Sequence, residues 1–330
     1  MMDLKQLKLF TQAAGPSGNE ENIKNVIERV ATPYADEIFA DVLGNLIVHK
    51  KGNGPRLMFD AHMDEIGIIA TFIEENGLIR FSNLGGIGPM TSLCQRVRFL
   101  NGVPGFVCRE LNGEDTLKLT DMYVDIGATT REEAEEKISV GDVAVFEGAF
   151  SEVGNRLISK AMDDRAGVFA LLETLKNVKE SPNDLYFVFT VSEELGLRGA
   201  KAVTATVHPD FAIAVDVTKT GDMPGKEKMA VSLGGGAAIK IKDSSVLCHP
   251  YMKDKMRAVC SRESIPYQLE VLESGGTDAG AISVSNGGVP TGAVSIPTRY
   301  IHTPMEMIDK KDLHAVIKLL IAMANETYEM

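Results

Sequence analysis

Two kinds of hydrophobic pattern follow one another along this chain of 330 residues. Before about residue 70, and again after about residue 154, helical periodicity alternates with short apolar runs that are typical of buried strands. Between these segments, short β-type runs separated by turn signals predominate. The pattern predicts a mixed-sheet α/β/α sandwich formed by residues 1–70 and 154–330, interrupted by a small all-β barrel at residues 71–153.

The first outer segment predicts helices at its start and a buried strand at its end. Ser17-Gly-Asn-Glu20 has the spacing of a capping box, in which the two outer side chains bond backbone N–H groups at a helix start. Apolar residues then recur on one helical face, at Ile23, Val26, Ile27 and Val30. The predicted strand runs from Arg56 to His62, and Met63, Asp64 and Glu65 follow it.

Short strands are expected throughout the insert. Glu75-Asn76-Gly77 and Asn101-Gly102 are typical of hairpin turns. Strands are predicted at residues 95–100, 105–110, 116–119 and 142–147, and one helix at 130–138, which begins with the capping residue Thr130.

The second outer segment returns to alternating strands and helices. Its first strand, at residues 155–159, leads into Lys160-Ala-Met-Asp163-Asp164-Arg-Ala-Gly167 and then into a strongly periodic helix. Further strands are predicted at residues 186–191, 211–215, 237–241 and 291–295, and further helices at 196–202, 251–263, 279–284 and from Asp312 onward.

Five of the predicted strands end close to residues that bind metals in proteins. These residues are His62, Asp163, the pair Glu193-Glu194, Asp216 and His302. Open α/β sheets place their ligands beyond the carboxyl ends of the strands, so we expect these side chains to converge. Individually each has an ordinary alternative: a core or loop histidine, a helix cap or a turn residue. Unrelated caps would not be expected to choose ligand types at five strand ends.

Two imidazoles with several carboxylates are suited to a pair of divalent cations. Two such cations repel each other strongly at short distance, so they need an anion between them, and a carboxylate can bridge with its two oxygens. Oxygen and imidazole donors favour Zn²⁺, Co²⁺ or Mn²⁺ over a metal that prefers thiolates. Asp64, two residues after His62, can accept the other ring N–H of that histidine.

Composition and charge argue against several other classes of protein. The net charge is −12 and no basic stripe is visible, which argues against a binder of nucleic-acid phosphates. No apolar run approaches a membrane span and the N-terminus lacks a signal-type core, so cytoplasmic residence is expected. The four cysteines lack metal-binding spacing and are expected to be reduced thiols in small apolar spaces.

Glycine runs at 234–236 and 275–276 lack the lysine of a phosphate-binding loop. Gly276, Thr277 and Asp278 are candidates to line a substrate pocket.

These motifs resemble the M42 family of dinuclear metallo-aminopeptidases, which includes glutamyl and tetrahedral aminopeptidases and members labelled endoglucanase or cellulase. The resemblance covers nearly the whole chain, with the insert in the family's place. The matching motifs, in the family's order, are Ala-His62-Met-Asp64-Glu, Ala-Met-Asp163-Asp164-Arg-Ala-Gly, Ser-Glu193-Glu194-Leu-Gly-Leu-Arg-Gly-Ala, Val-Asp216-Val-Thr and Tyr-Ile-His302-Thr-Pro.

The resemblance implies roles for these residues in hydrolysing the N-terminal peptide bond of short peptides. His62 and Asp216 would bind one metal, Glu194 and His302 the other, and Asp163 would bridge them, with a cis peptide bond between Asp163 and Asp164. The remaining two roles are that Asp64 orients His62 and that Glu193 is the catalytic general base.

The resemblance also implies dimerisation through the β insert and assembly of dimers into a homododecamer. Three alternatives remain at this point: a metal-dependent deacylase of N-acyl amino acids, a glycosidase and a non-catalytic scaffold. A glycosidase needs only two carboxylates and leaves His62, Asp216 and His302 without a role, and an intact Glu193 argues against a scaffold. The motifs do not fix which first residue the substrate carries.

Overall fold

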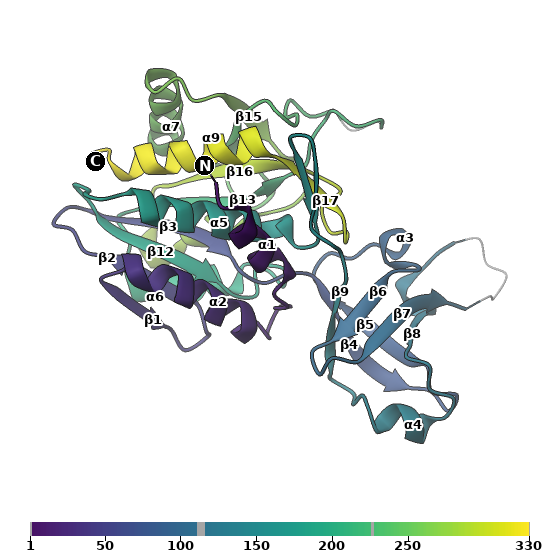
Figure 1. Ribbon diagram of the computed structural model, residues 1–330. Coiled ribbons are helices and arrows are strands. Elements are labelled where there is room, and N and C mark those ends of the chain that lie inside the picture. Colours follow the sequence, from purple (N-terminus) through teal and green to yellow (C-terminus); the bar gives the residue numbers. More distant parts are fainter. Residues whose placement is uncertain (1, 111–115, 226–227, 330) are drawn as a thin grey trace.

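The computed structural model describes residues 2–110, 116–225 and 228–329, and within these ranges the chain forms an eleven-stranded sheet flanked by helices and a closed six-stranded barrel beside it. Figure 1 shows the barrel as a separate body joined to the larger α/β body. The predicted α/β sandwich with an inserted β-barrel is therefore confirmed.

The large sheet is mixed, and the strands that lead to the candidate ligands all run in one direction. β12, β3, β13 and β16 are parallel neighbours; β11 is antiparallel to β17, which is antiparallel to β16, so β11 also shares their direction. Their carboxyl ends therefore meet at one edge. The strand order is β1 (Glu37–Ala40), β2 (Leu46–Lys50), β12 (Asp184–Thr190), β3 (Arg56–His62), β13 (Phe211–Thr218), β16 (Thr291–Arg299), β17 (Glu306–Asp309), β11 (Arg156–Ser159) and β10 (Ser151–Val153), with β14 (Ala237–Lys242) beside β16 and β15 (Tyr267–Val271) beside β14.

Helices cover both faces of this sheet, which explains why its central strands β3 and β13 are buried along nearly their whole length. Within β3, Phe59 and Ala61 lie in the core shared with α5, whereas Met58 lies in the core shared with α6. One face carries α1 (Leu4–Gln12), α2 (Glu21–Ala31), α5 (Met162–Asn177), α7 (Pro250–Arg262) and α9 (Lys310–Ala324); the other carries α6 (Arg198–Val207) and α8 (Ala279–Ser283). Short 3₁₀ turns lie at Thr32–Tyr34 (η1) and Ser285–Gly287 (η3).

The barrel closes in the order β4-β5-β8-β7-β6-β9, so none of its strands is left as an edge. Its interior is filled by apolar side chains such as Ile68, Val97 and Val124. The elements are β4 (Gly67–Ile73), β5 (Ile79–Leu84), α3 (Pro89–Ser92), β6 (Arg96–Phe99), β7 (Pro104–Arg109), η2 (Leu119–Asp121), β8 (Met122–Asp125), α4 (Arg131–Glu135) and β9 (Val143–Phe146).

The insert differs in detail from the expected residues 71–153. Its strands begin at Gly67 and end at Phe146, while β10 already pairs with β11 in the large sheet. The strand predicted at 116–119 is wrong: β8 follows it, because Met122 and Val124 fill the barrel interior while Leu117 and Leu119 are only partly buried. The cap at Thr130 is confirmed, since its hydroxyl accepts a bond from the backbone N–H of Glu133.

The capping box predicted at Ser17 and Glu20 is also wrong, although its helix is present. α2 begins at Glu21, and no side chain caps it. The hydroxyl of Ser17 instead donates to the carboxylate of Asp64 at 2.6 Å, a partner 47 residues away in the sequence.

The four cysteines differ in their exposure to solvent. Cys248 and Cys260 are buried as expected, whereas Cys94 is exposed and Cys108 is half-buried.

Among the described residues, no helix has both the length and the apolar content needed to span a bilayer.

Candidate metal centre

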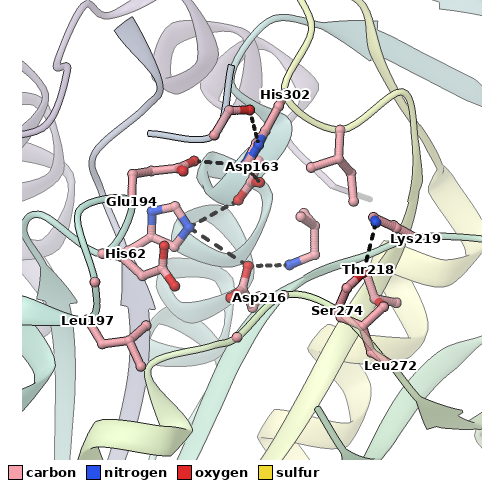
Figure 2. A pocket seen from close by; sticks show the side chains of 17 residues that line it. His62, Asp163, Glu194, Leu197, Asp216, Thr218, Lys219, Leu272, Ser274 and His302 are labelled. Carbon is pink, nitrogen blue, oxygen red and sulfur yellow. Dashed lines mark hydrogen bonds and ion pairs between the residues drawn. The ribbon is translucent and has the colours of Figure 1, made fainter. Parts of the chain in front are cut away.

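The predicted ligand residues come together at the edge where the parallel strands end. His62 is the last residue of β3, and Asp216 lies near the end of β13. Glu194 and His302 lie in the loops that follow β12 and β16, and Asp163 lies at the start of α5, after β11. Figure 2 shows these side chains facing one cavity. The sheet topology thus collects residues that are far apart in the sequence.

Asp163 lies between the two histidines. Its Oδ1 is 3.0 Å from Nε2 of His62, and its Oδ2 is 3.4 Å from Nε2 of His302. Nε2 of His302 is also 3.2 Å from Oε1 of Glu194, while Nε2 of His62 is 3.8 Å from Oδ1 of Asp216. Each oxygen of Asp163 therefore faces a different imidazole, which is the arrangement that a bridging carboxylate requires.

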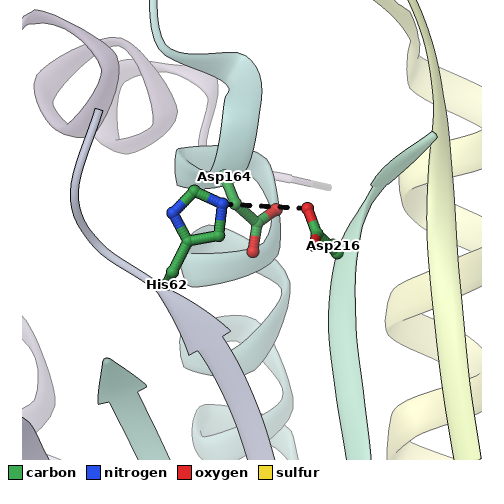
Figure 3. A group of neighbouring side chains, drawn as sticks. All are labelled: His62, Asp164 and Asp216. Atoms are coloured by element: carbon green, nitrogen blue, oxygen red, sulfur yellow. Dashed lines mark ion pairs between the residues drawn. The ribbon is translucent and has the colours of Figure 1, made fainter. Parts of the chain in front are cut away.

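Two groups of three side chains can each hold a cation. Asp163, Glu194 and His302 form one group, whose ligand atoms all lie within 4.8 Å of one another. The second group, shown in Figure 3, contains His62, Asp164 and Asp216, again within 4.8 Å. Asp164 was not among the predicted ligands, although it is adjacent to Asp163. The peptide bond between the two aspartates is cis, as the resemblance implied.

The backbone around the two aspartates explains why neighbouring carboxylates serve different groups. Both Asp163 and Asp164 have non-helical dihedral angles within the first turn of α5, so their side chains diverge. Oδ1 of Asp164 accepts a bond from the backbone N–H of Gly167 at 3.0 Å. Its buried Oδ2 has no hydrogen-bond partner among the described residues. A buried orphan oxygen of this kind fits a cation that the carboxylate would bind.

A second layer of groups fixes the ligands. Nδ1 of His62 lies 3.2 Å from the backbone oxygen of Asp64 and 3.4 Å from its Oδ1, so the expected partner of His62 is in place mainly through its carbonyl. Nδ1 of His302 donates to the backbone oxygen of Gly86 at 2.7 Å. These bonds direct Nε2 of each histidine toward the carboxylates, the usual orientation of a metal-bound imidazole.

Glu306 is a supporting residue that the sequence did not reveal. Its Oε2 accepts a bond from the backbone N–H of Asp163 at 3.0 Å, and its Oε1 accepts one from the backbone N–H of His302 at 2.8 Å. The side chain is buried. Glu306 follows His302 by only four positions. It also reaches the backbone of Asp163 because β17, where Glu306 lies, pairs with both β11 and β16.

Burial and the neighbouring charges shift the pKa values of the group strongly. Burial acts to lower the pKa of His302, but its bonds to Asp163 and Glu194 outweigh burial and raise that pKa to about 12. Burial, followed by the charge of nearby Asp163, raises the pKa of Asp216 well above its ordinary range. Burial likewise raises the pKa of Glu193, with Asp216 adding to the effect.

Carboxylates outnumber imidazoles in the two three-residue groups, with four against two. Divalent cations would supply the missing positive charge. The carboxylate and imidazole donors, the orphan oxygen of Asp164 and the two three-residue groups all fit such ions.

The cavity in front of the ligands has a volume of about 490 Å³, within the range for small-molecule sites. Glu193 lines it but belongs to neither three-residue group. The rest of the lining combines apolar and polar side chains, among them Leu197, Thr218, Lys219, Leu272 and Ser274 (Figure 2).

The expectation that residues 276–278 line the cavity holds for Gly276 only. Thr277 and Asp278 are buried, and their side chains bond within the protein. The hydroxyl of Thr277 donates to Asp243 at 3.1 Å, and Asp278 accepts a bond of 2.6 Å from the hydroxyl of Thr190. These two side chains therefore do not line the cavity, and Oδ1 of Asp278 has no hydrogen-bond partner among the described residues.

Comparison with known proteins agrees with this geometry. The sequence model of the family described as M42 glutamyl aminopeptidase matches residues 44–319. A putative aminopeptidase of Acetivibrio thermocellus is 49% identical over 323 residues, which cover 97% of each chain.

Two solved structures share the fold over nearly the whole chain. Aminopeptidase APDkam598 from the archaeon Desulfurococcus kamchatkensis is 37% identical with a TM-score of 0.94, covering 98% of this chain and 94% of its own. PhTET1, solved as a dodecamer, is 34% identical with a TM-score of 0.89, and the match covers 99% of this chain and 100% of the PhTET1 chain. The extent of the family match and of these identities shows that this chain belongs to the M42 family of aminopeptidases.

Proposed function

We propose that this protein removes N-terminal residues from short peptides, with Glu193 as the general base beside two divalent cations. As a member of the M42 family it is a metal-dependent aminopeptidase. The observation that carries the proposal is that two groups of ligand side chains and the separate carboxylate of Glu193 face one cavity. Zn²⁺, Co²⁺ and Mn²⁺ all suit these donors.

The ligands that would hold the cations are His62, Asp164 and Asp216 on one side and Glu194 and His302 on the other, with Asp163 facing both histidines. Bound cations would polarise the substrate carbonyl and make the attacking water more acidic.

Glu193 is suited to move the proton. Its carboxylate is in the cavity, and burial raises its pKa toward the range where a carboxylate can both take and return a proton. It accepts a proton from the water whose oxygen attacks the carbonyl carbon. When the carbon–nitrogen bond breaks, Glu193 returns this proton to the leaving amine nitrogen.

The carboxylates of the cavity also account for exopeptidase specificity. A free α-amine is cationic, and the negative charge of Glu193, Glu194 and Asp216 favours it. An internal peptide bond offers no such cation. A deacylase of N-acyl amino acids would instead need apolar space for an acyl group next to these carboxylates.

The test is metal removal followed by a substrate panel. Chelation is expected to abolish hydrolysis of aminoacyl-anilides, and Zn²⁺, Co²⁺ or Mn²⁺ to restore it. The same restored protein is expected to leave N-acyl amino acids and soluble glucans intact. Preferential hydrolysis of N-acyl amino acids would favour the deacylase, and release of sugars would favour the glycosidase.

We also propose that the barrel mediates dimerisation and that dimers assemble into a homododecamer in the cytoplasm. PhTET1, a relative of similar length, was solved as a dodecamer. The barrel exposes several large apolar side chains, namely Phe72, Met90, Leu100, Phe106 and Val140. Where such side chains form one contiguous patch, the patch marks a protein interface. Small-angle scattering is expected to show a hollow assembly of twelve subunits, and a monomer would refute this.

A further inference from the structure

The loop before α2 contacts the sheet edge that carries the candidate metal ligands, and it does so through two buried polar side chains. Ser17 and Glu20 are 3% and 7% exposed, and neither caps the helix. Neither lines the cavity. Both side chains point instead to residues that carry or support Glu193 and Glu194, which suggests an indirect role in the reaction.

Glu20 holds the turn that immediately precedes Glu193. Its Oε1 accepts bonds from the backbone N–H of Ser192 at 3.1 Å and from the hydroxyl of Ser192 at 3.3 Å. Ser192 has a φ of +54°, in the left-handed region that residues other than glycine seldom occupy. The same oxygen accepts the backbone N–H of Gly18 at 2.7 Å. Glu20 therefore stabilises the one backbone conformation that turns the chain into Glu193.

Ser17 reaches the next residues through Asp64. Its hydroxyl donates to Oδ2 of Asp64 at 2.6 Å. Asp64 in turn accepts the backbone N–H of Glu193 on Oδ1 at 3.0 Å and that of Glu194 on Oδ2 at 3.3 Å. Three consecutive backbone N–H groups, those of Ser192, Glu193 and Glu194, are thus bound by two buried carboxylates.

The loop is itself fixed to the body of the protein. The backbone N–H of Ser17 donates to the oxygen of Glu65, and the backbone N–H of Glu65 donates to the oxygen of Gly15 at 3.0 Å. The fully buried guanidinium of Arg165 donates to the backbone oxygens of Phe10 and Ala13. These bonds hold the backbone that carries Ser17 and Glu20 in place, as a positioning residue requires.

We propose that Ser17 and Glu20 are positioning residues that aim the Glu193 carboxylate at the attacking water. The proposal rests on the role of Glu193 as general base. A shift of about 1 Å in a reacting group can cost on the order of 100-fold in rate, so loss of a bond to this turn is expected to lower kcat. The metals should remain, because neither side chain belongs to the two ligand groups.

The experiment compares Glu20→Ala, Glu20→Gln and Ser17→Ala as metal-loaded enzymes, with Glu28→Ala as control. Glu28 is an exposed residue of the same helix. Glu20→Ala is expected to lower kcat by about 10- to 100-fold, with little change in KM and full metal content. Glu20→Gln should recover most of the activity, because a single oxygen of Glu20 accepts all the bonds to Ser192 and Gly18. Ser17→Ala should show a smaller loss of kcat.

A double-mutant cycle with Glu193→Gln separates positioning from a general loss of structure. If Glu20 acts through the carboxylate of Glu193, Glu20→Ala should have little further effect once that carboxylate is gone. Equal losses of kcat in both backgrounds, or an unchanged kcat in both Glu20→Ala and Ser17→Ala, would overturn the inference. Full activity of Glu193→Gln alone would instead overturn the assigned base. If Glu20→Ala fails to fold, Ser17→Ala carries the same cycle.

Discussion

Glu306 binds the backbone of Asp163 across 143 residues of sequence, with its Oε2 3.0 Å from the backbone nitrogen of that aspartate. The other carboxylate oxygen accepts the backbone N–H of His302 at 2.8 Å. One buried side chain therefore sets the positions of both the candidate bridging ligand and a histidine of the metal centre.

Glu306→Gln should weaken metal binding, because an amide offers only one acceptor oxygen and places an N–H₂ group against a backbone N–H. Loss of such a supporting bond typically costs 10- to 100-fold in metal affinity, and we expect about this loss. Calorimetric titration of chelated protein with Zn²⁺ measures it. Glu152→Gln is the control, since Glu152 is exposed and pairs with Lys310 away from the site. Equal affinities of the two variants would contradict the expected role.

Glu193→Gln should separate proton transfer from metal binding. The side chain keeps its shape and belongs to neither ligand group, so metal content should remain at the parental value. We expect kcat for aminoacyl-anilides to fall by about 10²- to 10⁴-fold, the usual contribution of a general base. Glu194→Gln should behave differently and lose metal, because Glu194 contacts His302 directly. A parental kcat in Glu193→Gln would exclude this residue as the base.

The sequence allowed the convergence of the candidate ligands to be predicted because apolar strands and polar strand ends form a local pattern. His62 ends a strand whose residues are almost all buried, and Asp216 lies in another. Once such strands are parallel, their ends must be near each other. This step needs no knowledge of side-chain contacts.

Residues whose roles depend on distant partners could not be recognised in this way. Asp164 has the same type and neighbourhood as Asp163, and only the local backbone sends its carboxylate toward His62 and Asp216. Ser17 has the spacing of a helix cap, yet its hydroxyl binds Asp64 instead. Local propensity predicts what a side chain can bond, while the tertiary fold decides which partner it meets.

Lys219→Ala should change which charged first residues the enzyme prefers. Apart from the two histidines, Lys219 is the single basic side chain among the described residues that line the cavity, and its Nζ lies 3.4 Å from the hydroxyl of Ser274. Removing this charge should lower the ratio of Glu-anilide to Lys-anilide hydrolysis by about fivefold, the effect of one partly screened charge at close range. Lys219→Arg keeps the charge and should keep the ratio. An unchanged ratio in Lys219→Ala would show that the substrate side chain lies elsewhere.

Asp278→Asn should flatten the pH dependence of stability in the metal-free protein. Burial raises the pKa of Asp278 to about 6, against about 4 in an unfolded chain. The folded protein therefore binds more protons, and the stability that this group contributes below pH 4 is lost as pH rises toward 6. Asparagine cannot ionise and can still accept the bond from Thr190.

Denaturant unfolding at pH 4.5 and pH 7 tests this prediction. The free energy of unfolding of the parental protein should fall more between the two pH values than that of Asp278→Asn, by about 2 kcal/mol for a two-unit shift. Asp254→Asn is the control, since its side chain is exposed. If the free energy of unfolding changed equally with pH in all three proteins, Asp278 would not bind a proton in this pH range. A cation of the fold other than the missing metals would then have to balance its charge.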